Sequence, residues 1–364
     1  ADEFMIVTDL DDTEEACRLA ERLQAEIRLP IWDHATPFQI HTSFGITTFA
    51  AAGDMESVDD VLRRVDIALQ NAKINGDEVT VFHPDMEMSL RERVELEKAL
   101  EEAIDTERVE PWFQPCIDLE TNRIRSFEVL ARWTHPERGP IPPTVFVPVA
   151  EERGLLGRMT LSLLRRAATI ARDWPNDLKI AVNLSPMQFR NPWLAQEILQ
   201  TLTEVGFPPR RLEIEITENA LVVDHDQAVS TIMSLKNQGI SIALDDFGTG
   251  YASLHQLRVL PFDKIKIDQS FVRTMVENSE SRKIIKAIIG LSGSLGLPTT
   301  AEGIETSVNA EDLRELGCTL GQGYLFSRAI PGADVPALLA ATAAKAQEAL
   351  PAPLESAEIG RAHV

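Results

Sequence analysis

The sequence predicts an α/β protein in which a (β/α)8 TIM-like barrel follows a smaller, partial α/β domain. Its 364 residues exceed the usual length of one domain, and 44% hydrophobic with 25% charged residues is ordinary for globular cores. Between residue 109 and about residue 340, strand-like and helical segments alternate, with eight strand-like segments in all. That alternation is typical of a barrel of parallel strands.

We expect four segments along the chain. They are a partial α/β domain at 1–85, a linker helix at 86–108, the barrel at 109–345 and a disordered tail at 346–364. The codons that would encode the last seven residues, Glu358–Val364, resemble a sequencing adapter, so we treat these residues as a possible artefact of a truncated gene fragment; a natural polar tail is the alternative.

The first 85 residues show strand and helix patterns in turn. Thr13 is the expected N-cap of its helix, and Gly76 is the expected C-cap of the second helix. The predicted elements are a strand at Phe4–Thr8, a helix at Thr13–Ile27, an alternating stretch at Phe38–Phe49, an amphipathic helix at Ser57–Asn75 and a strand at Glu78–Phe82.

The segment Met86–Asp105 is rich in charge, with apolar residues at Leu96, Leu100, Ala103 and Ile104. This spacing predicts a helix with one apolar face. Two interpretations stay open for it, a rigid connector that transmits a signal between domains and a solvated spacer.

The barrel elements follow in order. Predicted strands are Trp112–Leu119, Ile124–Arg132, Ile180–Leu184, Leu212–Ile216, Ser241–Leu244, Lys264–Ile267, Thr299–Ala301 and Thr319–Gly321. Predicted helices are Pro143–Glu151, Met159–Asp173, Pro186–Val205, Gln227–Gly239, Ser253–Leu257, Ser281–Leu295 and Ser307–Glu315. The alternative fold, an open doubly wound sheet, usually has a glycine-rich first turn, and this sequence has none.

Charge and cysteine content exclude several classes of protein. A formal net charge of −22, from 35 basic and 57 acidic residues, argues against binding to nucleic acid polymers or to anionic membranes. A phosphorylated substrate would therefore need metal cations. The three cysteines form no CxxC pair, and no apolar run reaches 18 residues, so we expect a cytoplasmic protein. The chain begins at Ala1 in what looks like mid-domain, and a membrane anchor ahead of it stays open.

Oxygen-bearing and amine side chains lie at or near the ends of most barrel strands, where barrel enzymes place their chemistry. They are Glu128, Arg132, Asn183, Glu215, Glu218, Asp245, Asp246, Lys266, Asp268, Glu302, Glu305 and Gln322. One such carboxylate alone is commonly a helix N-cap. Several around one barrel mouth would repel each other unless cations neutralise them. Ligation by oxygen alone favours Mg²⁺ or Mn²⁺, and the seven histidines form no HExxH pair.

Two positions in this set have further consequences. If the Asp245 carboxylate bridges two metal ions, these ions lie about 3.5–4 Å apart, the arrangement used in phosphoryl chemistry. The glycines of the segment 245–251 fit a surface loop as well as a mobile lid or hinge. Lys266 is either a structural counter-ion or a proton-transfer or electrostatic group with a depressed pKa.

Seven motifs in order resemble those of EAL-type cyclic di-GMP phosphodiesterases, from residue 109 to about 335. They are Glu128-Val129-Leu130-Ala131-Arg132, Val182-Asn183-Leu184-Ser185, Glu215-Ile216-Thr217-Glu218, Asp245 to Tyr251, Lys266-Ile267-Asp268, Ala301 to Glu305 and Gly321-Gln322-Gly323-Tyr324. The signature reads Glu-Val-Leu rather than Glu-Ala-Leu, which keeps the acid. All metal-binding and lysine positions of the family are filled, which favours an active enzyme.

The resemblance implies a metal-dependent hydrolysis of cyclic di-GMP to linear pGpG, with two Mg²⁺ or Mn²⁺ ions per active site. It implies that Glu128, Asn183, Glu215 and Asp245 bind the first metal and that Asp245, Asp246 and Glu302 bind the second. The implied catalytic residues are Lys266, Glu302 and Glu128. The implied substrate contacts are Gln114, Arg132, Gln322 and Glu305, and Glu218 is the implied loop anchor. Family members suggest a homodimer through the barrel. The alternatives are a catalytically inactive cyclic di-GMP receptor and an acid-rich barrel enzyme with another phosphorylated or enolisable substrate.

The first 85 residues resemble the C-terminal half of a GGDEF-type diguanylate cyclase domain. The resemblance rests on Asp2-Glu3-Phe4, Ser43-Phe44-Gly45-Ile46 and Asp66 to Lys73 with Gly76. Ala1 stands where the family has a glycine, Gln70 replaces a tyrosine, and the half with the first metal-binding aspartate is absent, so we expect no cyclase activity from this chain. An unrelated α/β subdomain is the alternative. The resemblance also implies an upstream sensor or cyclase region in the parent protein.

Overall fold

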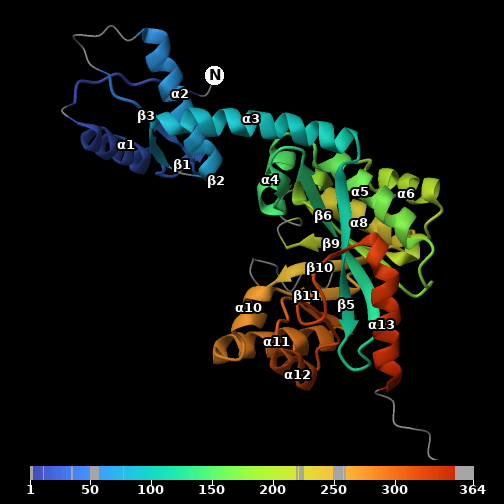
Figure 1. Ribbon diagram of the computed structural model, residues 1–364. Coiled ribbons are helices and arrows are strands. Elements are labelled where there is room, and N and C mark those ends of the chain that lie inside the picture. The colour runs from blue at the N-terminus through green and yellow to red at the C-terminus, as the bar shows by residue number, and fades with distance from the viewer. Residues whose placement is uncertain are drawn as a thin grey trace, which may run out of the picture. The chain divides into compact units, whose positions relative to one another are not determined.

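The computed structural model describes residues 3–348 except 11, 34–35, 50–56, 77, 219, 221–224, 249–256 and 258–259. The chain divides between Ala99 and Leu100 into two compact units. Among the described residues, no helix combines the length and apolar character needed to cross a membrane. Figure 1 shows the elements of each unit.

The first unit contains two small sheets and the two helices that its sequence predicts. Its elements are α1 (Thr13–Ile27), β1 (Ile31–Asp33), β2 (Thr36–Phe38), β3 (Phe44–Ile46), α2 (Val58–Asn75) and β4 (Val79–Val81). Strands β1 and β2 pair antiparallel, and β3 and β4 pair parallel. Helix α2 packs on β3, where a side chain at Gly45 would come within 2.3 Å of the Leu69 backbone nitrogen. Helix α3 (Pro84–Asp105) follows.

Three predictions for the first unit need correction. The segment Phe4–Thr8 is not a strand, and the Phe4 side chain is 95% exposed. Only Phe44–Ile46 and the end of β2 are strand within the alternating stretch Phe38–Phe49. The N-cap of α1 is Asp12, whose carboxylate accepts a hydrogen bond from the Glu15 backbone at 2.8 Å, because a residue one position earlier can reach the free N–H groups of the first turn. The Gly76 cap is confirmed, with a φ of 71°.

The second unit is a closed barrel of eight strands. Its strands are β5 (Val109–Asp118), β6 (Ile124–His135), β8 (Lys179–Leu184), β9 (Leu212–Thr217), β10 (Ser241–Phe247), β11 (Lys264–Ile267), β12 (Thr299–Ala301) and β13 (Leu320–Gln322). The neighbours run β5-β13-β12-β11-β10-β9-β8-β6, and β6 pairs with β5 to close the ring. Two short strands, β7 (Gly139–Ile141) and β14 (Ile330–Pro331), extend the sheet beyond the ring. The predicted barrel class is confirmed.

One strand departs from an all-parallel barrel. Strand β5 runs antiparallel to both of its ring neighbours, β6 and β13. No helix separates β5 from β6, and the Asp118 carboxylate turns the chain by accepting hydrogen bonds from the Glu120 and Thr121 backbones. Such a short connection makes an antiparallel pair, since a parallel pair needs a crossover of a dozen or more residues.

Helices surround the ring and cover its apolar outer face. They are α4 (Pro143–Glu152), α5 (Leu156–Ala171), α6 (Leu194–Val205), α8 (His225–Asn237), α10 (Gln269–Thr274), α11 (Ser279–Ser294), α12 (Ser307–Glu315) and α13 (Val335–Glu348). The predicted helix Pro186–Val205 is two pieces, the 3₁₀ turn Pro186–Arg190 and α6, because Ser185 caps the turn in its own capping box.

Two other predictions of local structure have different outcomes. Most of the predicted helix Ser253–Leu257 lies outside the described residues. Helix α13 continues to Glu348, three residues into the segment predicted as a tail, and the rest of that segment lies outside the described residues.

Candidate active site

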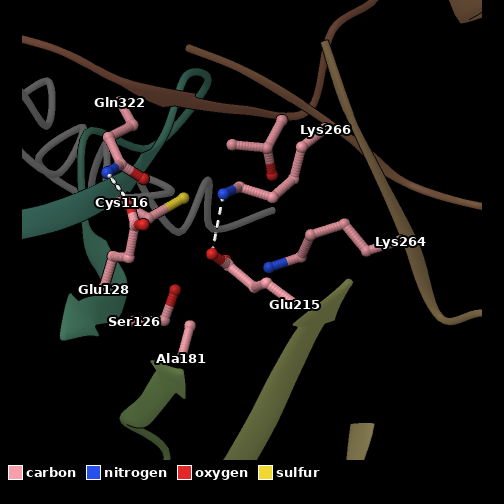
Figure 2. A pocket seen from close by; sticks show the side chains of 9 residues that line it. Cys116, Ser126, Glu128, Ala181, Glu215, Lys264, Lys266 and Gln322 are labelled. Atoms are coloured by element: carbon pink, nitrogen blue, oxygen red, sulfur yellow. Dashed lines mark hydrogen bonds and ion pairs between the residues drawn. The ribbon is translucent and has the colours of Figure 1, made fainter. Parts of the chain in front are cut away.

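Strand register and alternation position the predicted site residues on the inner face of the barrel. Glu128 is opposite Gln114 of β5 and Ala181 of β8, and Asn183 is opposite Glu215. Because side chains alternate along a strand, residues two apart on β6, β9 and β11 face the same interior. Figure 2 shows the result, a pocket where Glu128, Glu215, Lys266 and Gln322 converge.

Both carboxylate oxygens of Glu128 accept hydrogen bonds. Asn183 Nδ2 donates to Oε1 at 2.7 Å, and Gln322 Nε2 donates to Oε2. The Gln322 amide also donates to Gln114 Oε1 at 3.2 Å, and Gln114 Nε2 donates to the Ser327 carbonyl at 3.3 Å. Four of the predicted site residues therefore form one connected network that holds the Glu128 carboxylate in place.

The Lys266 ammonium lies among the acidic residues of the site. Its side chain is almost fully buried, and Nζ lies 2.7 Å from Glu215 Oε2, 3.1 Å from Asp245 Oδ2 and 2.5 Å from Glu302 Oε1. Burial lowers the pKa of Lys266, but the charges of Asp245, Glu128, Glu215 and Glu302 outweigh it and hold the pKa well above its usual value. The prediction of a depressed pKa is therefore wrong for this arrangement, because the carboxylates outnumber the ammonium.

The carboxylates themselves resist ionisation. Burial raises the pKa of Glu302 to about 8 and that of Asp246 to about 6, and repulsion from Asp245 adds to both. Burial also raises the pKa of Glu215 well above its usual value, although Lys266 partly opposes this. One buried ammonium does not satisfy this many acids, so the site favours additional positive charge.

Three of these acids meet the geometric requirement for a shared cation. Oxygens of Asp245, Asp246 and Glu302 all lie within 4.8 Å of one another. The Asp246 backbone has a φ of 54°, unusual for a residue with a side chain, and its N–H donates to Asp245 Oδ1 at 2.9 Å. All the candidate ligands are oxygens, and the raised pKa values of Asp246 and Glu302 express a deficit of positive charge. The residues present therefore fit a hard divalent cation such as Mg²⁺ or Mn²⁺.

The loop after β10 is hydrogen-bonded to Glu218, the residue that follows β9. The Gly248 backbone N–H donates to Glu218 Oε1 at 3.0 Å, and Gly248 has a φ of 103°, which side chains rarely tolerate. Glu218 is buried, so this contact fixes the start of the loop. The remaining loop residues, Thr249 to Tyr251, lie outside the described residues.

Two predicted substrate contacts lie apart from the Lys266 cluster. The Arg132 guanidinium lies 5.7 Å from the Trp112 ring centroid and donates to the Ala131 carbonyl at 2.8 Å. Burial lowers the Arg132 pKa, and electrostatic interactions with Tyr324 and Glu128 partly oppose this. Glu305 is exposed, and its carboxylate pairs with Arg273 of α10 at 3.2 Å.

A second layer of polar residues in the barrel interior was not predicted. The pocket is also lined by Cys116, Ser126, Lys264 and Thr300, and Lys264 Nζ lies 2.6 Å from Glu213 Oε1. The signal was present as repeated residues two apart on a strand, Glu213 with Glu215 and Lys264 with Lys266. Only the folded barrel shows that these two strands, which flank β10, direct the four side chains into the same interior.

Comparison with known proteins identifies the family of this chain. The EAL domain family matches residues 97–329, and the GGDEF domain of diguanylate cyclases matches residues 1–79. The chain is 32% identical to the cyclic di-GMP phosphodiesterase NbdA of Pseudomonas aeruginosa, over 93% of this chain and 44% of that protein. It spans 41 to 48% of the length of the curated relatives it matches most strongly.

Solved structures agree with the fold. The phosphodiesterase PaMucR, in complex with c-di-GMP, is 34% identical with a TM-score of 0.64 and covers 66% of this chain and 99% of its own. BlrP1 of Klebsiella pneumoniae, in a calcium and c-di-GMP complex, is 29% identical with a TM-score of 0.55 and covers 61% and 56% respectively. The EAL match covers most of this chain and includes every candidate ligand. The chain therefore belongs to the EAL domain family, and its residues 1–79 match part of a GGDEF domain.

Proposed function

We propose that this chain hydrolyses one phosphodiester bond of cyclic di-GMP to give linear pGpG, with two divalent cations, Mg²⁺ or Mn²⁺, at the barrel mouth. The observation that carries the proposal is the cluster around Lys266, where Glu215, Asp245 and Glu302 crowd one ammonium within 3.1 Å. Relatives whose names include cyclic di-GMP phosphodiesterase support the substrate and the reaction class.

Two overlapping sets of residues are the proposed ligands of the two cations. Glu128, Asn183, Glu215 and Asp245 are the proposed ligands of the first, and Asp245, Asp246 and Glu302 those of the second. When bound, the two cations neutralise this acid cluster, lower the pKa of a water molecule and polarise the phosphate. Gln322 and Asn183 orient Glu128 through their hydrogen bonds to its two oxygens.

Lys266 orients the attacking water and keeps its proton. Its raised pKa makes it a hydrogen-bond donor and an electrostatic group rather than a base at neutral pH. Arg132, whose planar guanidinium suits a phosphate, and Gln114 are proposed substrate contacts. Glu305 is a proposed contact that must first release Arg273. Glu218 anchors the loop after β10 through Gly248.

The proposal includes two larger-scale features from the family resemblance. One is a homodimer through the barrel, and the other is an upstream sensor or cyclase region in the parent protein. Neither is needed for the arrangement of residues around Lys266, which comes from one barrel.

The test is to incubate the purified chain with cyclic di-GMP and either Mg²⁺ or Mn²⁺ and to follow pGpG by chromatography. We expect pGpG to accumulate only when a divalent cation is present, and chelation to stop it. Tight binding of cyclic di-GMP without turnover would replace the proposal with a receptor function. Neither binding nor turnover would overturn both.

A further inference from the structure

The barrel interior contains two ion pairs, one below the other. The upper pair joins Glu215 of β9 to Lys266 of β11, and the lower pair joins Glu213 to Lys264 at 2.6 Å. The residues of each pair are two positions from those of the other on the same strand, so the pairs are about 6.6 Å apart along the strands. All four side chains are buried, and Figure 2 shows Lys264 and Lys266 reaching toward Glu215 from the same strand.

The strand between β9 and β11 leaves room for both pairs to cross it. Ala243 of β10 is opposite Glu215 on one side and Lys264 on the other. Alanine is small and fully buried here, so lysines of β11 extend over it to the glutamates of β9. The Lys264 ammonium therefore interacts electrostatically with two glutamates of β9, Glu213 and Glu215, and Glu215 also pairs with Lys266.

We propose that Lys264 is a positioning residue for the catalytic centre, because it occupies Glu213 and so leaves Lys266 to the upper carboxylates. The inference rests on the proposed function. Without Lys264, the buried Glu213 carboxylate loses its ion-pair partner, and the ammonium of Lys266, two positions along the same strand, can turn toward it. Lys266 then turns down the barrel, away from Asp245 and Glu302, and no longer orients the attacking water.

Replacement of Glu213 instead of Lys264 should cause a different defect. Without Glu213, Lys264 has no partner in the lower layer and turns up toward Glu215, a proposed metal ligand. An ammonium on that carboxylate competes with a divalent cation. The loss of Lys264 thus impairs turnover, the loss of Glu213 impairs metal binding, and the loss of both removes the two causes together.

The test compares K264M, E213L and the double variant K264M/E213L in the full chain. Steady-state hydrolysis of cyclic di-GMP gives kcat and KM, and calorimetric titration of metal-free protein with Mn²⁺ alone gives the metal affinity. We expect about a 10- to 100-fold fall in kcat for K264M with little change in KM, which is the range for supporting partners of metal ligands. We expect about a 10-fold weaker Mn²⁺ affinity for E213L, and values close to wild type for the double variant.

Other outcomes overturn the inference. A K264M kcat equal to wild type contradicts the role of Lys264, and a double variant as slow as K264M points to general damage to the barrel. If K264M does not fold, the Mn²⁺ affinity of E213L against the double variant decides the matter, because recovery requires that the two residues act on each other. A wild-type chain that binds Mn²⁺ but leaves cyclic di-GMP intact refutes the proposed function instead, and the Mn²⁺ titrations still test the pair.

A matched control variant distinguishes the effect of losing any ion pair from the effect of losing the pair of Glu213 with Lys264. Lys236 of α8, a helix outside the ring, pairs with Asp263 at 2.6 Å. Asp263 is the residue before Lys264 in the sequence. The K236M variant should lower the thermal midpoint and leave kcat, KM and Mn²⁺ affinity unchanged. A fall in kcat comparable to that of K264M would contradict the specific role of the lower pair.

Discussion

The two units of this chain bury their side chains very differently. In the first unit, the buried hydrophobic residues among those described are three alanines with Ile67 and Leu96, while Phe4 is almost fully exposed. The barrel has a continuous core that includes Phe113, Phe127 and Trp174, whose rings pack edge to face or tilted at 5.0 to 6.5 Å. Helices cover the outer face of the closed ring, so this core lies between the strands and the helices, whereas a two-stranded sheet offers little surface to cover.

The same difference applies to charge. Most of the ion pairs described in the first unit, such as that of Lys73 with Glu3, have solvent-exposed side chains. In the barrel, Lys264 and Lys266 pair with glutamates inside the ring. Exposed pairs contribute little to stability, while a buried charge that loses its partner is costly. Among the described residues, the buried groups with strongly raised pKa values therefore lie in the barrel.

The largest expected effect is on turnover. Glu128→Ala removes a proposed metal ligand together with the acceptor of the Asn183 and Gln322 hydrogen bonds, so kcat for cyclic di-GMP should fall by more than about 100-fold, beyond the range for a supporting partner. The matched change in the first unit is Asp66→Ala, whose carboxylate accepts only from the exposed Gln70 among the contacts described. Its kcat should equal wild type. Equal rates for both variants would remove Glu128 from the site.

The next effect is on stability. Phe127→Ala opens a cavity beside Phe113 and Trp174 and should lower the free energy of unfolding of the barrel by about 3–5 kcal/mol. Leu62→Ala in α2 removes a side chain that is 37% exposed and should cost less than about 1 kcal/mol. Urea unfolding followed by tryptophan fluorescence measures both. Similar costs would contradict the contrast between the two units.

A smaller effect concerns pH. Because the pKa of Glu302 is raised to about 8 and that of Asp246 to about 6, the folded barrel keeps protons that the unfolded chain releases. The metal-free protein should therefore lose stability as the pH rises from about 5 to about 8, and the stabilisation by Mn²⁺ should grow over the same range. Lys266 contributes stability that is lost only above about pH 10.5, outside this window.

Thermal midpoints in EDTA and in Mn²⁺ check the pH prediction. Glu302→Gln, which cannot ionise, should flatten the decline in EDTA. A midpoint that rises with pH in the metal-free protein would show that the carboxylates are ionised without a cation.

The smallest effect should follow from removal of the part of the first unit that precedes α3. A chain that begins at Pro84 keeps the whole of α3 and the barrel, and each proposed catalytic residue lies in the barrel. Its kcat and KM should stay within about two-fold of the full chain, because a domain with its own core folds alone. A large loss of activity would mean that the first unit contributes to catalysis directly.

Local sequence patterns predict much of this structure. The bounds of α1, α12 and the strand Lys264–Ile267 match their predictions, since apolar periodicity and capping residues act over a few residues. The strand predicted at Phe4–Thr8 is wrong because a strand needs a neighbour to pair with, and alternation alone does not supply one.

For the site, the sequence by itself determined the ligand types. Acids after successive strands predicted an oxygen-rich, metal-dependent mouth, and the structure brings Asp245, Asp246 and Glu302 within reach of a common cation. Only the tertiary structure decided the raised pKa of Lys266 and the lower pair of Glu213 with Lys264. Each depends on which residues face each other across the closed ring and on how deeply they are buried. Distance and burial arise from packing among strands far apart in the sequence, so no local pattern contains them.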